Sequence, residues 1–135
     1  MLRFPGGESV HVVVGGSHTR GLLTTLECEH APGAGGRHVH LGAHKAVCVL
    51  AGRYLFRVGT DQVHLGAGGF VFIPAGVAHD FTVASDRGRA LFCFTPAGIE
   101  QYFHDLAVSL ASVNGEGGGD VSALRARYGI EPASA

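Results

Sequence analysis

The fold of this chain is decided by the stretch His38-Val39-His40-Leu41-Gly42-Ala43-His44-Lys45, together with a later stretch, Pro74-Ala75-Gly76-Val77-Ala78-His79. Side chains at i and i+2 of an extended strand point to the same face, so His38 and His40 are expected to lie side by side. A Pro/Gly turn before His79 can bring a third imidazole to the same place. Three converging imidazole nitrogens can bind a divalent transition metal ion.

Length and composition set the class of protein. The 135 residues fit one domain that is large enough to bury a core. No apolar run is long enough to cross a membrane, and the N-terminal residues lack the apolar segment of a secretory signal, so we expect a cytoplasmic protein. The net charge is -1 and the basic residues are scattered, which argues against nucleic acid or an anionic membrane as a partner.

Three cysteines, Cys28, Cys48 and Cys93, lie within apolar runs and lack the C-x-x-C spacing of metal or redox motifs. We expect them to be buried, reduced thiols.

Short runs rich in Val, Phe, Leu and Thr, separated by glycine turns, predict β-strands. These runs cover 10–14, 22–29, 46–50, 54–58, 62–65, 70–73, 80–83 and 90–95. Many short antiparallel strands with glycine turns are typical of a sandwich or barrel, so the predicted fold class is all-β.

The C-terminal third has a different pattern. Apolar residues at helical spacing predict an amphipathic helix over 97–110 that packs on the barrel. Glycine-rich residues 112–120 predict a linker, and 121–128 predict a short helix that Gly129 ends. We therefore expect a barrel with its first C-terminal helix over 1–111, the linker, and a short helix with a tail over 121–135.

These features resemble the cupin superfamily, whose members form a double-stranded β-helix, or jelly-roll, barrel. The first cupin motif reads H-x-H, three or four residues, Glu, six residues, Gly, and the chain matches it with His38, His40, Lys45 and Gly52. The second motif reads Gly, five residues, P-x-G-x-x-H, and is matched by Gly68, Pro74, Gly76 and His79. The segments 70–74, 94–103 and 124–131 are similar to single-domain quercetin dioxygenase-like cupins. The departure is Lys45, which stands where the family has its glutamate.

The resemblance implies a jelly-roll barrel with one or two C-terminal helices packed outside it. It also implies that His38, His40 and His79 hold Zn, Fe, Ni, Mn or Cu inside the barrel. The implied function is a metal-dependent enzyme of small-molecule, or secondary, metabolism: a dioxygenase, cyclase or isomerase acting on an aromatic or polyketide-like compound. In quercetinase-like relatives the glutamate also acts as a base, so its replacement disfavours a ring-cleaving dioxygenase.

Lys45 shares a strand face with Val47 and Val49, which this fold turns toward the barrel interior. Burial and a neighbouring dication both lower the pKa of an ammonium group. Three outcomes are open for Lys45. It is neutral and acts as a donor, base or nucleophile, it pairs with Glu27 or Glu29, or it reaches the barrel mouth. We take Lys45 and Glu27 as candidate catalytic residues.

His44 is one residue out of phase with Lys45, so it should face away from the interior unless a β-bulge turns it inward to become a fourth ligand. Apolar residues are expected to line or back the pocket, and they suit a flat aromatic or polyketide-like molecule. These residues are Val47, Val49, Phe72, Phe81, Phe92 and Phe94.

The lysine also motivates an alternative function, a non-catalytic or metal-free module that binds a hydrophobic small ligand. Barrels of this type commonly pair through edge strands, so a homodimer is expected from the fold.

Overall fold

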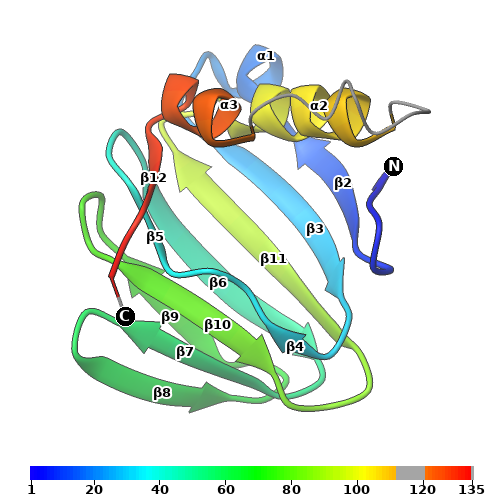
Figure 1. The fold of residues 1–135 in the computed structure, drawn as a ribbon, viewed down its shortest axis with the longest axis vertical. Helices are drawn as coiled ribbons and strands as arrows, with labels where there is room; N and C mark the ends of the chain where they lie inside the picture. Colours follow the sequence, from blue (N-terminus) through cyan, green and yellow to red (C-terminus); the bar gives the residue numbers. More distant parts are fainter. Residues whose placement is uncertain (112–120, 135) are drawn as a thin grey trace.

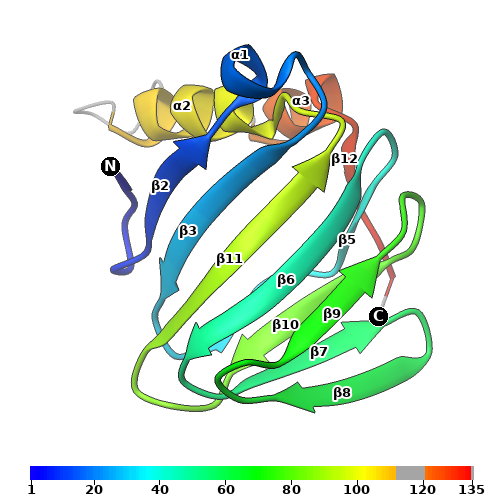
Figure 2. The same ribbon diagram turned by 180° about the vertical axis from the view of Figure 1, so that it is seen from behind.

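The computed structural model describes residues 1–111 and 121–134, and within these ranges two sheets face each other while the helices gather across one end (Figures 1 and 2). The first sheet has the order β1 (Leu2–Arg3), β2 (Ser9–Val14), β3 (Thr24–His30), β11 (Gly88–Thr95), β6 (His44–Ala51) and β9 (Phe70–Ile73). The second has the order β12 (Ile130–Pro132), β5 (His38–His40), β10 (His79–Val83), β7 (Tyr54–Val58) and β8 (Asp61–Leu65), with β4 (Gly33–Ala34) also paired to β10. This is the predicted all-β jelly-roll fold, and the prediction is confirmed.

Strand alternation builds the core between the sheets. Along β6, Lys45, Val47 and Val49 are buried while their neighbours are more exposed, as a period of two requires. On the adjacent β11, Phe94 is paired with Lys45 and Phe92 with Val47, so these side chains lie on the same inner face. Lys45 is therefore part of the barrel interior.

The helices are α1 (Gly16–Thr19), α2 (Ile99–Leu110) and α3 (Val121–Arg127). Glu100 connects the start of α2 to β3 and α1. Its carboxylate accepts hydrogen bonds from the Thr24 hydroxyl at 2.7 Å and from the Gly16 N–H at 2.6 Å. The two C-terminal helices are joined by Arg125, which donates to the Tyr102 hydroxyl, and by Tyr128, which donates to Asp105. Together they cover the end of the barrel nearest the histidines.

The structure extends the predicted organisation at the C-terminus. Residues 130–132 do not form a tail beside the barrel, because they pair with the H-x-H strand, with Ile130 opposite His40. The predicted helices are present as α2 and α3, whereas α1 was not predicted because it has a single turn and no apolar periodicity. The predicted linker over 112–120 lies outside the described residues.

The cysteines are free thiols, as predicted; Cys28 is buried, whereas Cys48 and Cys93 are partly buried. In the part of the chain that the structure describes, none of the helices combines the length and apolarity that a membrane span needs.

Candidate metal centre

His38, His40 and His79 form one cluster, with a potential ligand nitrogen from each lying within 4.8 Å of the others. Strand β5 supplies the first two from alternate positions, and β10 places His79 directly opposite His38 in the antiparallel register. The ring centroids of His38 and His79 are 4.5 Å apart. The cluster that the H-x-H spacing predicts is therefore present.

Backbone carbonyls fix the orientation of two of these rings. The Nδ1 atom of His79 is 2.9 Å from the carbonyl oxygen of Val77, and Nδ1 of His38 is 3.0 Å from that of Gly36. Because a carbonyl can only accept, each Nδ1 carries the proton and each Nε2 keeps its lone pair. This is the arrangement by which proteins orient metal-binding imidazoles.

The histidines are also in the protonation state that a metal requires. Burial, reinforced by the nearby charge of Lys45, lowers the pKa of His38 to about 4, of His40 to about 2 and of His79 to about 3. All three imidazoles are therefore neutral near pH 7, and no proton has to be removed from them before a metal binds.

Lys45 is the single lysine of the chain and is only 4% exposed. Its Nζ atom lies 3.3 Å from Nε2 of His79, and because that nitrogen holds a lone pair, Lys45 donates the hydrogen bond. The amine also lies 4.8 Å from the ring centroid of Phe92 and 5.7 Å from that of Phe94. Burial lowers the pKa of Lys45 to about 8.

This contact bears on how a metal would fit. On a tetrahedral zinc ion, ligand nitrogens lie about 2.1 Å from the metal and hence about 3.4 Å from one another. The imidazoles, spread over as much as 4.8 Å, have to move closer together, and Nε2 of His79 has to exchange its bond to Lys45 for one to the metal. The donor set suits a late divalent metal, with Lys45 competing for one of the three nitrogens.

The pairing of Lys45 with Glu27 or Glu29, one of the three outcomes that the sequence left open, is not present. Glu27 pairs with Arg89, and Glu29 pairs with Arg87. Both glutamates point away from the interior because the inward positions of β3 are those of Leu26, Cys28 and His30. The structure therefore does not bring Glu27, a candidate catalytic residue, to the histidines. Nor does Lys45 reach the barrel mouth.

His44 also stays outside the cluster. It is exposed, its Nδ1 accepts a hydrogen bond from the Ala75 N–H at 3.0 Å, and its ring stacks on Phe72. The pairing of β6 with β9 is regular here, so there is no bulge to turn His44 inward, and it occupies the outer face opposite to Lys45.

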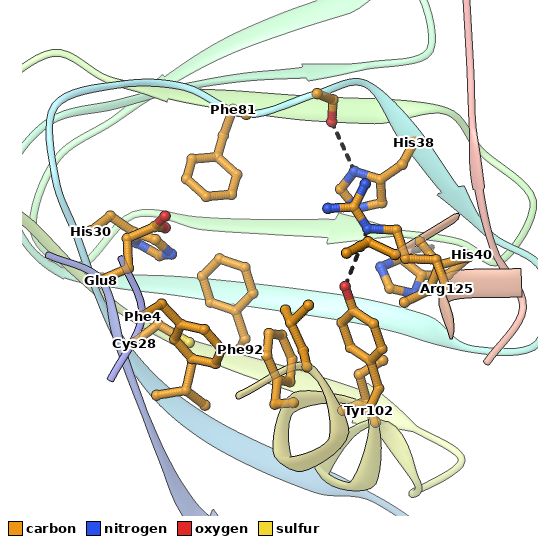
Figure 3. Close-up of a pocket in the computed structure, with 18 of the residues that line it drawn as sticks. Phe4, Glu8, Cys28, His30, His38, His40, Phe81, Phe92, Tyr102 and Arg125 are labelled. Atoms are coloured by element: carbon orange, nitrogen blue, oxygen red, sulfur yellow. Dashed lines mark hydrogen bonds between the residues drawn. The ribbon is translucent and has the colours of Figure 1, made fainter. Parts of the chain in front are cut away.

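A cavity of about 760 Å³ adjoins the histidines and extends beneath α2 (Figure 3). Of the predicted pocket residues, Phe81, Phe92 and Phe94 line it. Val47 and Val49 are fully buried in the core and are not part of the lining, and Phe72 is 51% exposed on the outer face of β9.

The sequence did not reveal how much of the lining comes from other elements. Further walls are supplied by α2 and α3, through residues such as Tyr102, Phe103 and Arg125, and by the N-terminal segment, through Phe4 and Glu8. The helical period of α2 contained a signal for the first two, since it predicted which face packs on the barrel.

Comparison with known proteins agrees with this fold. A model of the cupin domain matches residues 26–98. An uncharacterized protein of Streptomyces coelicolor is 40% identical over 48 residues, or 36% of this chain, and the match spans 46% of that relative's length.

Among solved structures, an RmlC-like cupin from Shewanella frigidimarina superposes with a TM-score of 0.64 at 20% identity, covering 75% of this chain and 87% of that one. A chain from the structures of the DMSP lyases RdDddP and RnDddQII has a TM-score of 0.59 at 25% identity, covering 69% of this chain and 49% of that one. The jelly-roll fold, both motifs and the match to the cupin domain over more than half of its length show that this chain belongs to the cupin family.

Proposed function

We propose that this protein is a metal-dependent enzyme that acts on a flat, apolar small molecule of the aromatic or polyketide type. The observation that carries the proposal is the position of His38, His40 and His79 beside a cavity walled by aromatic side chains. A metal held there would polarise an oxygen of the substrate. The likeness to a DMSP lyase, although it covers only half of that chain, supports the view that this fold can host an enzyme here.

Lys45 is the residue that we assign to proton transfer. It contacts His79, lines the same cavity as His38 and His40, and in the metal-free protein has a pKa lowered to about 8 by burial. A bound dication would lower this pKa further, so the Lys45 amine would be neutral in the metal-loaded site and able to accept a proton from the substrate. We therefore favour a cyclase or isomerase over a ring-cleaving dioxygenase, in which the missing glutamate would be the base.

Metal analysis of the purified protein, followed by titration with Zn, Mn, Fe, Ni and Cu salts, tests the first half of the proposal. One equivalent of metal is expected to bind. His79→Ala should abolish this binding, whereas the control His64→Ala, at an exposed position on β8, should leave it unchanged. Absence of stoichiometric metal in both the purified and the titrated protein would refute it.

The second part of the proposal, that the protein is an enzyme, is tested by a search for turnover. Flavonols and aromatic polyketide-like compounds should be screened with the metal-loaded protein, with product formation followed by mass spectrometry. Activity should be lost in His79→Ala and strongly reduced in Lys45→Met. Turnover that Lys45→Met leaves intact would remove Lys45 from the reaction.

The hydrogen bond from Lys45 to His79 favours a second candidate, a metal-free module that binds a hydrophobic ligand, because it occupies one of the three ligand nitrogens. This module would bind the same aromatic compounds equally well after treatment with a chelator, and without turnover. The enzyme would lose activity in the chelator and regain it when metal is added back.

A further inference from the structure

A second polar group of residues lies at the end of the cavity away from the metal centre. Figure 3 shows Glu8, Cys28 and His30 together at that end, separated from His38 and His40 by aromatic side chains. None of these three takes part in the proposed chemistry. His30 is the last residue of β3 and is only 7% exposed.

The protonation of His30 is set by Tyr54. The Tyr54 hydroxyl lies 2.7 Å from Nδ1 of His30, and Tyr54 is 1% exposed. If His30 donated this bond, the buried hydroxyl proton would have no acceptor, since among the described residues the hydroxyl contacts no other hydrogen-bonding group. Leaving a buried donor unpaired is costly, so Tyr54 donates and Nδ1 accepts.

It follows that the other nitrogen of His30 is a hydrogen-bond donor. Burial lowers the pKa of His30 to about 4, so the ring is neutral and its single proton is on Nε2. Within the described chain, every fully buried side-chain nitrogen or oxygen has a partner. Nε2 has none, so it is not fully buried, and because His30 lines the cavity this N–H opens onto it.

The surroundings of His30 hold the ring in place. Its centroid is 4.8 Å from that of Phe81 and 5.5 Å from that of Phe92, and both rings also line the cavity. Behind it, a Cβ atom at Gly88 would lie 2.6 Å from the Tyr54 hydroxyl oxygen, so Tyr54 packs directly against the backbone of β11. Glu8 shares this end of the cavity, and the positive charges of Lys45 and Arg87 also act on His30.

We infer that His30, positioned by Tyr54, is a second recognition point that selects an aromatic ligand with a hydrogen-bond-accepting oxygen on the end remote from the metal. A methoxy, carbonyl or phenolic oxygen on a flat ring has this chemistry. The inference deepens the proposed function and rests on it only in taking this ligand to be the substrate of the enzyme. The His30 site itself needs no metal.

The first test measures the proton on His30 directly. Long-range proton–nitrogen NMR spectra of the ligand-free, metal-free protein should show His30 as the tautomer with its proton on Nε2. Tyr54→Phe removes the hydroxyl donor and should give a mixture of tautomers. A wild-type His30 that carries its proton on Nδ1 would overturn the inference.

The second test uses naphthalene and 2-methoxynaphthalene, two flat probes of which only the second carries an acceptor oxygen. Metal-free wild-type protein should bind the methoxy compound about five- to tenfold more tightly, as one hydrogen bond provides. His30→Phe should bring the ratio of the two affinities close to one. Because the ratio is taken within each variant, a general loss of affinity does not imitate the result.

Equal affinities in the wild type, binding of neither probe, or a preference that survives in His30→Phe would each overturn the inference. If the preference is found and no metal binds to the triad, the proposed enzymatic function fails while the His30 site stands. The two ideas can therefore fail separately.

Discussion

Removing the Lys45 amine should strengthen metal binding at the histidine triad and remove its dependence on pH. The variant is Lys45→Met, which keeps an unbranched side chain of similar length in the same aromatic surroundings. In the wild-type protein the amine donates to Nε2 of His79, a nitrogen that the metal requires. Metal binding must therefore break this bond and accommodate the charge of Lys45.

The distance between Lys45 and a bound metal determines how strongly their charges repel each other. With Nζ 3.3 Å from Nε2 and a metal about 2.1 Å from the same nitrogen, the ammonium and the dication would be no more than about 5.4 Å apart. At an effective dielectric constant of about 20 their repulsion is roughly 6 kcal/mol. Removing the proton from a group of pKa about 8 costs only about 1.4 kcal/mol at pH 7. Lys45 therefore loses its proton when the metal binds.

The broken hydrogen bond adds about 1 kcal/mol to this cost, so Lys45→Met should bind zinc roughly fiftyfold more tightly at pH 7. Wild-type affinity should rise about tenfold per pH unit up to pH 8 and then level off, because one proton is released per metal. The three histidines do not add to the pH dependence of zinc affinity above pH 5, since their pKa values are about 4 or lower. The variant should show a flat profile.

Competition titrations of zinc against a chromophoric chelator, from pH 6 to pH 9, provide the measurement. His64→Ala is the control, and it should follow the wild-type curve. A wild-type affinity that is flat between pH 6 and pH 8 would refute competition by Lys45, as would a Lys45→Met variant that binds zinc no better than the wild type at pH 7.

Four further predictions concern stability in the absence of metal. The folded pKa of Lys45, about 8, lies below that of a free lysine, so wild-type stability should rise as the pH increases from 8 to about 10.4. At pH 7, where the charged amine is buried at full cost, urea unfolding should find Lys45→Met more stable by about 2 kcal/mol after allowing for its lost hydrogen bond. The buried histidines of the triad and His30 have pKa values below the unfolded value of about 6.5. The free energy of unfolding should therefore fall as the pH drops from 6.5 to 5, by about 1–2 kcal/mol for each histidine. Thermal melts over this pH range provide the measurement. Gly15→Ala should lower the free energy of unfolding by about 1–3 kcal/mol, because its Cβ would lie 2.6 Å from the Glu100 carboxylate that holds α2. Gly66→Ala, with open space around it, is the matched control. Equal unfolding midpoints for the two variants would contradict this prediction.

The spacing of residues was enough to predict the histidine cluster and the longer strands, but not the short strands β1, β4 and β12. A period of two placed His38 and His40 on one face and Lys45 in the interior, because these depend only on the local geometry of a strand. The same alternation, applied to β3, would also have excluded Glu27, since Leu26 and Cys28 define its inner face.

Contacts across the barrel could not be predicted in this way. The bond between Lys45 and His79 joins strands of different sheets, and the position of Phe72 depends on the register that pairs it with Ala46 on the outer face. The contact of His30 with Tyr54 likewise connects the two sheets. Such contacts depend on how the sheets pack, which the pattern of a single strand does not contain.

Gly88 has no side chain, yet it determines which atom the far end of the cavity presents to a ligand. Any larger residue there would displace the Tyr54 hydroxyl and release the proton of His30 to move between its two nitrogens. Among natural relatives that recognise a ligand as this protein does, glycine at this position should therefore be inherited together with tyrosine at 54 and histidine at 30. Relatives that carry a side chain at this position would be expected to have changed ligand.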